Sequence, residues 1–112
     1  MFWAAGFSFS KSQLIKDCGY QSDFTHVFFG EEQFQMYKMW KKGYQLFTPT
    51  TNVCSHLWTR SQRAHSFEVT KQSAELQLEN LARMKSIMLR DKEYVDYMKA
   101  QVGLDIENSC KI

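Results

Sequence analysis

One stretch, residues 26–60, constrains the fold more than any other part of the chain. It places an apolar run and Gly30 immediately before two adjacent carboxylates, Glu31 and Glu32, and these open an aromatic-rich segment with apolar residues at helical spacing. We therefore expect a helix over residues 31–42 whose N-terminus carries both glutamates.

The two glutamates have two interpretations. The positive end of a helix dipole keeps a carboxylate ionised, so it can accept a proton or a hydrogen bond from a hydroxyl. The same position also suits residues that only complement the first helical turn. Glu31 and Glu32 are accordingly candidate catalytic residues, with a purely structural role as the alternative.

Three short segments have the pattern of strands. Residues 7–10 alternate phenylalanine and serine, the period of a half-buried strand, and residues 44–48 and 52–58 flank a turn that contains Pro49. Packed against the helix over residues 31–42, they predict an α/β fold.

Further helices are predicted on both sides of this region. Ser10 can cap a short helix over residues 11–18. Residues 67–90 carry apolar side chains at spacings of three and four, which predicts an amphipathic helix. A shorter helix follows Asp91 and ends at Gly103.

Charge and cysteine usage exclude several classes of protein. The 14 basic and 12 acidic residues are scattered along 112 positions, so no basic stripe indicates a nucleic-acid partner. No apolar run reaches the roughly 20 residues that span a bilayer, which predicts no membrane contact from this segment. Three widely separated cysteines do not form a disulfide framework, so we expect reduced thiols and a cytoplasmic protein.

Several motifs together resemble a known family. They are FWAAGFSFS at residues 2–10, FFGEE at 28–32 and CSHLWTR at 54–60. In this order they resemble the C-terminal half of cytoplasmic-type glycosyltransferases that transfer N-acetylglucosamine from UDP-GlcNAc to hydroxyproline on a protein. More distantly, they are similar to polypeptide N-acetylgalactosaminyltransferases.

The resemblance implies a fold and a division of the chain. Residues 1–68 would be the C-terminal portion of a GT-A-type nucleotide-diphospho-sugar transferase domain, and residues 69–112 a helical C-terminal extension. The partners would be a UDP-sugar donor and a protein acceptor. The compartment would be the cytoplasm, or the Golgi if a missing N-terminal part carries an anchor.

The resemblance also assigns donor contacts near the start of the chain. In these transferases the equivalent alanine and glycine stretch runs under the donor sugar and diphosphate, which makes Trp3, Ala5 and Gly6 candidate substrate-binding residues. The alternative for Trp3 is a place in an aromatic core strand.

Two histidines are further candidates. His26 ends a polar loop that leads to the acceptor side in the related families, so it is a candidate for substrate binding, with a structural role as the alternative. His56, followed by Leu57 and Trp58, matches a histidine–aliphatic–aromatic motif of the polypeptide N-acetylgalactosaminyltransferases, in which the histidine helps to hold Mn²⁺ on the UDP diphosphate. The resemblance therefore implies that His56 is a metal ligand. Without the resemblance, His56 reads as a packed, hydrogen-bonded side chain.

The implied reaction transfers a hexosamine to a hydroxyl. If the anomeric configuration is retained, as in the families resembled, Glu31 orients acceptor or donor hydroxyls and need not act as a base. The main metal-binding motif of the class, Asp-x-Asp or Asp-x-His, is absent from the 112 residues. We therefore expect a fragment that is inactive alone. The competing hypothesis is a non-catalytic module whose C-terminal helices bind a protein partner.

Two structural expectations follow. Glu31 and His56 should converge on one cleft, on either side of the transferred sugar. Apolar surface should be exposed around residues 2–10, because the other half of the sheet would cover it in a complete domain.

Overall fold

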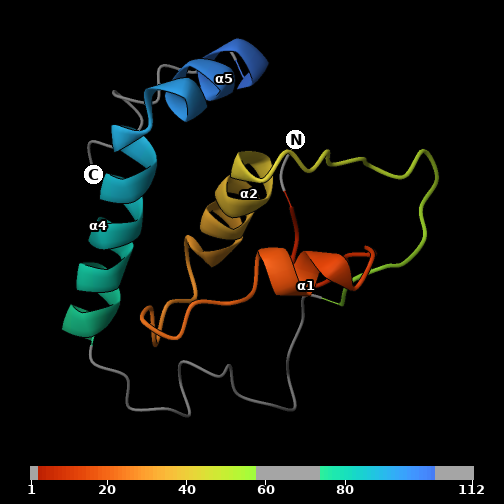
Figure 1. Cartoon of the computed structure of the whole chain (residues 1–112). Coiled ribbons are helices and arrows are strands. Elements are labelled where there is room, and N and C mark those ends of the chain that lie inside the picture. Colours follow the sequence, from red (N-terminus) through yellow and green to blue (C-terminus); the bar gives the residue numbers. More distant parts are fainter. Residues whose placement is uncertain (1–2, 58–73, 103–112) are drawn as a thin grey trace.

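The computed structural model describes residues 3–57 and 74–102. Its helices are α1 (Gln13–Asp17), α2 (Glu31–Lys41), α4 (Ala74–Arg90) and α5 (Lys92–Val102). Helix α2 lies between α1 and α4, and α5 follows α4 after a turn at Asp91 (Figure 1). Within these residues no helix is long and apolar enough to cross a membrane.

The predicted α/β fold is wrong for the described residues, which form helices and contain no strand. Residues 7–10, 44–48 and 52–57 were expected in strands, and all of them lack regular structure; Trp58 lies outside the described residues. A two-residue period produces a strand only where a neighbouring segment pairs with its backbone and covers one face. Neither condition is met here, and the side chains of Phe9 and Phe47 are 100% and 81% exposed.

Helix α2 begins and ends for local reasons. Gly30 precedes it with φ of 94°, a backbone conformation that favours glycine, and the first turn carries both glutamates. At the other end the N–H of Gly43 donates to the Trp40 carbonyl at 2.9 Å, and Gly43 has φ of 77°. The predicted helix over residues 31–42 is confirmed to within one residue.

A small core joins α1 to α2. Leu14 of α1 and Cys18, the C-cap of that helix, pack with Met39 of α2, and all three side chains are buried. Trp3, Tyr44 and Leu46 pack against this cluster from the flanking segments. Helix α1 is shorter than the predicted residues 11–18, and its N-cap is Ser12 instead of Ser10.

A row of aromatic rings connects α2 with its other neighbours. Phe34 packs edge to face on Phe24 of the preceding loop, with ring centroids 5.2 Å apart. Tyr94 of α5 contacts both Tyr37 and Trp40 of α2, at 4.8 Å and 5.2 Å between centroids. The aromatic face of α2 is therefore core, as its periodicity predicts.

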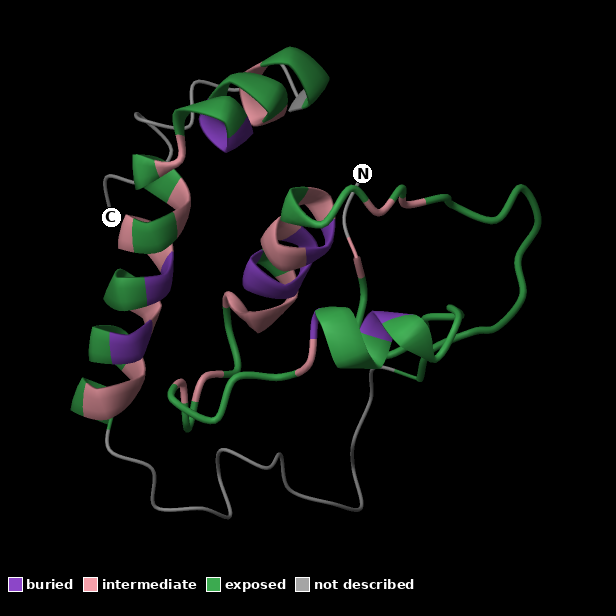
Figure 2. Cartoon of the chain, in the orientation of Figure 1, coloured by how far each residue is buried: buried purple, intermediate pink, exposed green. Residues whose placement is uncertain are grey.

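The buried side of α4 faces α2 (Figure 2). It includes Asn80 and Met84, whereas Leu78 is 66% exposed although it belongs to the apolar spacing in the sequence. Asp91 ends α4 and caps α5, because its Oδ1 accepts a hydrogen bond from the Tyr94 N–H at 3.3 Å. The predicted shorter helix after Asp91 is confirmed as α5, and Gly103, its predicted end, lies outside the described residues.

Candidate functional site

Glu31 borders a cavity of about 190 Å³ at the N-terminal half of α2. Its polar lining on α2 comes from Glu31, Gln35 and Lys38, which share one face of the helix because they are four and three residues apart. The rest of the lining comes from the loop between α1 and α2, from the same helix and from α4: Tyr20, Gln21, Phe24, Val27, Phe34 and Met84. This set is called the Glu31 cavity below.

Two hydrogen bonds join the lining residues Gln35 and Lys38 to the backbone at the end of α1. The Lys38 ammonium donates to the Gly19 carbonyl, and the Gln35 Nε2 donates to the Cys18 carbonyl. Loss of hydration lowers the pKa of Lys38 below its usual 10.5, and the same cause raises the pKa of the buried Cys18 thiol. An ammonium has three N–H donors, so Lys38 keeps donors for a ligand after bonding Gly19.

The two neighbouring glutamates have different surroundings. The Glu32 Oε1 accepts the backbone N–H of Ala5 at 2.8 Å, which ties the N-terminal segment to the first turn of α2. Glu31 instead lines the cavity, and no hydrogen bond or ion pair joins its carboxylate to another of the residues the structure describes. Of the predicted catalytic pair, Glu31 is the one placed to meet a ligand.

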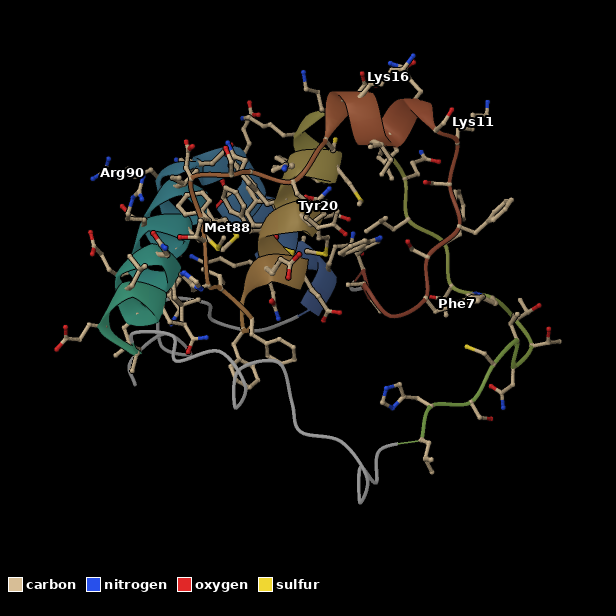
Figure 3. The ribbon with its side chains drawn as sticks, turned by 90° about the horizontal axis from the view of Figure 1, so that it is seen from below. Phe7, Lys11, Lys16, Tyr20, Met88 and Arg90 are labelled. Atoms are coloured by element: carbon tan, nitrogen blue, oxygen red, sulfur yellow. The ribbon has the colours of Figure 1, made fainter. Side chains whose placement is uncertain are left out.

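Trp3 borders a second, larger cavity of about 530 Å³. This Trp3 cavity lies between residues 3–10 and residues 44–49, with Leu14 and Met39 beneath it. Figure 3 shows Tyr20 over α2 and Phe7 on the separate N-terminal segment that borders the Trp3 cavity. Ala5 and Gly6 follow the lining residues Trp3 and Ala4, and a Cβ at Gly6 would meet no protein atom within 4 Å. The backbone at Gly6 is therefore open to a ligand.

The two histidines that were predicted as site residues, His26 and His56, do not line the Glu31 cavity. His26 is exposed and has φ of 63°, and its carbonyl accepts a hydrogen bond from Gln77 Nε2 of α4 at 3.1 Å. His56 is exposed among residues 51–57. Neither of the two cavities contains Glu31 together with His56.

Residues 3–57 and 74–102 contain no group of three or more His, Cys, Asp or Glu side chains that could hold a metal ion. A neutral imidazole is an accepted ligand of Mn²⁺, so His56 fits as a single ligand. The described side chains do not complete a donor set around it.

Sequence reasoning missed most of the polar lining of the Glu31 cavity. Gln35 and Lys38 carried a readable signal, since they follow Glu31 at helical spacing on the same face. Met84 carried none, because it reaches the cavity from a helix 53 positions further along the chain.

Comparison with known proteins identifies the family. A model of the family described as glycosyltransferase (GlcNAc) matches residues 1–109, which is nearly the whole chain. No curated protein and no solved structure matches the chain. The chain belongs to the glycosyltransferase (GlcNAc) family.

Proposed function

We propose that this chain forms the sugar-binding and acceptor-binding part of an enzyme that transfers N-acetylglucosamine from UDP-GlcNAc to a protein hydroxyl of the hydroxyproline type. The observation that carries this proposal is the Glu31 cavity. It combines a carboxylate without a protein partner among the described residues, a cation and three aromatic rings in a space of about 190 Å³.

This lining suits a neutral, hydroxyl-rich ring. A carboxylate accepts hydrogen bonds from hydroxyls, and an ammonium donates to hydroxyl or acetamide oxygens. Phe24 and Phe34 supply apolar faces for the C–H side of the sugar. In this proposal Glu31 orients a hydroxyl of the sugar or acceptor, and Lys38 fixes the opposite side of the ring.

The nucleotide part of the donor is assigned to the segment that begins at Trp3. Trp3 borders the larger cavity, and the open backbone at Gly6 lets a diphosphate approach. The hydrogen bond from Ala5 to Glu32 places this segment against the same helical turn that carries Glu31. A donor that spans both cavities would therefore present its sugar near Glu31.

We propose Mn²⁺ as the metal of the complete enzyme, with His56 as one ligand beside diphosphate oxygens. When bound, the metal neutralises charge on the leaving diphosphate. The roles of Glu31, Lys38 and Trp3 do not depend on it. His56→Ala should weaken the Mn²⁺-dependent part of UDP binding measured by calorimetry and leave the metal-free part unchanged. Equal loss with and without Mn²⁺ would remove His56 from the metal site.

The test of the proposed function uses methionine methyl groups as reporters in solution NMR. Met84 lines the Glu31 cavity, and Met98 of α5 does not. Titration of UDP-GlcNAc into the 112-residue chain should shift the Met84 methyl signal and leave Met98 unchanged. UDP alone should shift the Trp3 indole signal without moving Met84.

Glu31→Gln provides the decisive variant. It should weaken GlcNAc binding about fivefold, because a charge-assisted hydrogen bond becomes a neutral one. Glu32→Gln is the matched control and should leave the Met84 response unchanged. Absence of any Met84 shift, or equal effects of the two substitutions, would overturn the assignment and leave the non-catalytic module as the better hypothesis.

For the compartment we propose the cytoplasm. Cys18 and Cys54 are both free thiols, one buried and one exposed, which is the usual state in a reducing compartment. A fluorescent fusion of the natural full-length protein tests this, and a Golgi pattern would contradict it.

A further inference from the structure

The loop between α1 and α2 is fastened to α4 through Asn80. The Asn80 side chain is 2% exposed, and its Nδ2 donates to the Thr25 carbonyl at 2.9 Å. Its Oδ1 accepts a hydrogen bond from Arg83 Nη1 at 3.2 Å. Because both ends of this buried amide are bonded, its orientation is fixed.

Two neighbours of Asn80 hold the residues on either side of Thr25. Gln77 Nε2 donates to the His26 carbonyl at 3.1 Å, and the Arg83 guanidinium lies 5.0 Å from the centroid of the Phe24 ring. Gln77, Asn80 and Arg83 follow one another at intervals of three along α4, so they lie close together on the helix surface. Three consecutive loop residues are thus held by one face of α4.

One of the contacts falls on a strained backbone. His26 has φ of 63°, in the left-handed region that a residue other than glycine occupies at a cost. A conformation of this kind persists where the surrounding contacts fix it. The bond from Gln77 to the His26 carbonyl supplies such a contact directly beside Asn80 and Thr25.

The fastened loop is a wall of the Glu31 cavity. Phe24 and Val27 line the cavity from the loop, and Met84, one turn after Asn80, lines it from α4. We propose that Asn80 is a positioning residue: by holding Thr25 it fixes Phe24 in the wall of the Glu31 cavity, and so sets the affinity of the cavity for the sugar. The effect on sugar affinity rests on the proposed function, whereas the effect of Asn80 on the position of Phe24 does not.

Asn80→Asp separates the two halves of the contact. The new carboxylate keeps an acceptor for Arg83, but an oxygen replaces the N–H that donates to Thr25. In the ligand-free protein the ring signals of Phe24 and the Met84 methyl should shift, and the backbone amides of residues 24–27 should exchange faster. UDP-GlcNAc affinity should fall about tenfold.

Three further variants complete the experiment. Gln77→Glu removes the neighbouring donor at a half-buried site and should give a smaller change of the same kind, which keeps the test decisive if Asn80→Asp does not fold. Glu79→Gln, an exposed change on α4, should alter nothing. Asp91→Asn should lower stability at the far end of α2 without changing sugar affinity, which separates positioning from general destabilisation.

The outcomes distinguish the two proposals. If the unaltered chain does not bind UDP-GlcNAc, the proposed function fails, while the ligand-free spectra still decide whether Asn80 holds the Phe24 wall. If the chain binds and Asn80→Asp changes neither the spectra nor the affinity, the positioning role of Asn80 is wrong. If affinity falls equally in Asp91→Asn, the effect is one of stability and the positioning role is again wrong.

Discussion

The backbone N–H of Ala5 donates to the Oε1 of Glu32 at 2.8 Å, which joins two segments 27 positions apart. The bond fixes the N-terminal segment beside the first turn of α2. The Glu32 carboxylate is therefore hydrogen-bonded within the protein, whereas the neighbouring Glu31 side chain lines the cavity.

Glu32→Ala should therefore act on structure. Loss of one hydrogen bond to a charged acceptor at an exposed site should lower the free energy of unfolding by about 1 kcal/mol. The Ala5 amide signal should move in the NMR spectrum, and Glu32→Gln should restore most of the stability because it keeps an acceptor oxygen. Gln33→Ala, at an exposed neighbouring position, is the control. An Ala5 signal unchanged in Glu32→Ala would show that the bond does not form in solution.

Gly30→Ala should destabilise the start of α2. Gly30 has φ of 94°, and a Cβ there would lie 2.5 Å from Leu81 Cδ1 of α4. The Leu81 methyl can swing aside, so the backbone strain dominates, and we expect a loss of about 1–2 kcal/mol in thermal or urea unfolding. Gly6→Ala has open space around the new methyl group and should have little effect. Equal stability of the two variants would contradict this account.

The chain should lose stability in acid through Asp91. The Asp91 Oδ2 lies 2.5 Å from Lys41 Nζ and 3.0 Å from the Tyr37 hydroxyl. Lys41 foremost, then the Tyr94 N–H and the Tyr37 hydroxyl, hold the pKa of Asp91 below its usual 3.8. A depressed pKa means that this stabilisation is present above pH 3.8 and is lost as pH falls through the folded-state pKa.

The measurement is the melting temperature of the wild type and of Asp91→Asn between about pH 2 and pH 6. The two curves should converge in acid and separate above pH 4, with the variant less stable there. Asp96→Asn, at an exposed position of α5, should follow the wild type. Parallel curves for wild type and Asp91→Asn would show that Asp91 has the same pKa in the folded and unfolded states.

The Trp3 cavity should promote association. Phe9 and Phe47 stand on its two sides with exposed fractions of 100% and 81%. Apolar side chains of this size in one patch bind hydrophobic dyes and favour self-association. Phe9→Ser with Phe47→Ser should reduce dye fluorescence and concentration-dependent light scattering while leaving the melting temperature unchanged. Light scattering that persists in the double variant would show that the chain self-associates through another surface.

The sequence by itself determined where α2 and α5 begin and where α2 ends. The start of α2 follows from Gly30 and the carboxylates of its first turn, and the start of α5 follows from the capping side chain of Asp91. The end of α2 follows from Gly43 after its last turn. These signals are readable because helical hydrogen bonds join residues four apart, so the residues that stabilise a helix are its own sequence neighbours. The same spacing places Gln35 and Lys38 on the face of Glu31.

Only the tertiary structure decided whether residues 7–10 and 44–48 form strands, because pairing requires backbone from a distant part of the chain. It also decided that Asn80 is buried while Leu78 is 66% exposed. That choice depends on the angle at which α4 meets α2 and on the carbonyl of Thr25, which lies 55 positions away. A polar side chain can be buried without a large cost only where a hydrogen-bond partner lies within reach, and no local pattern in the sequence specifies where that partner will be.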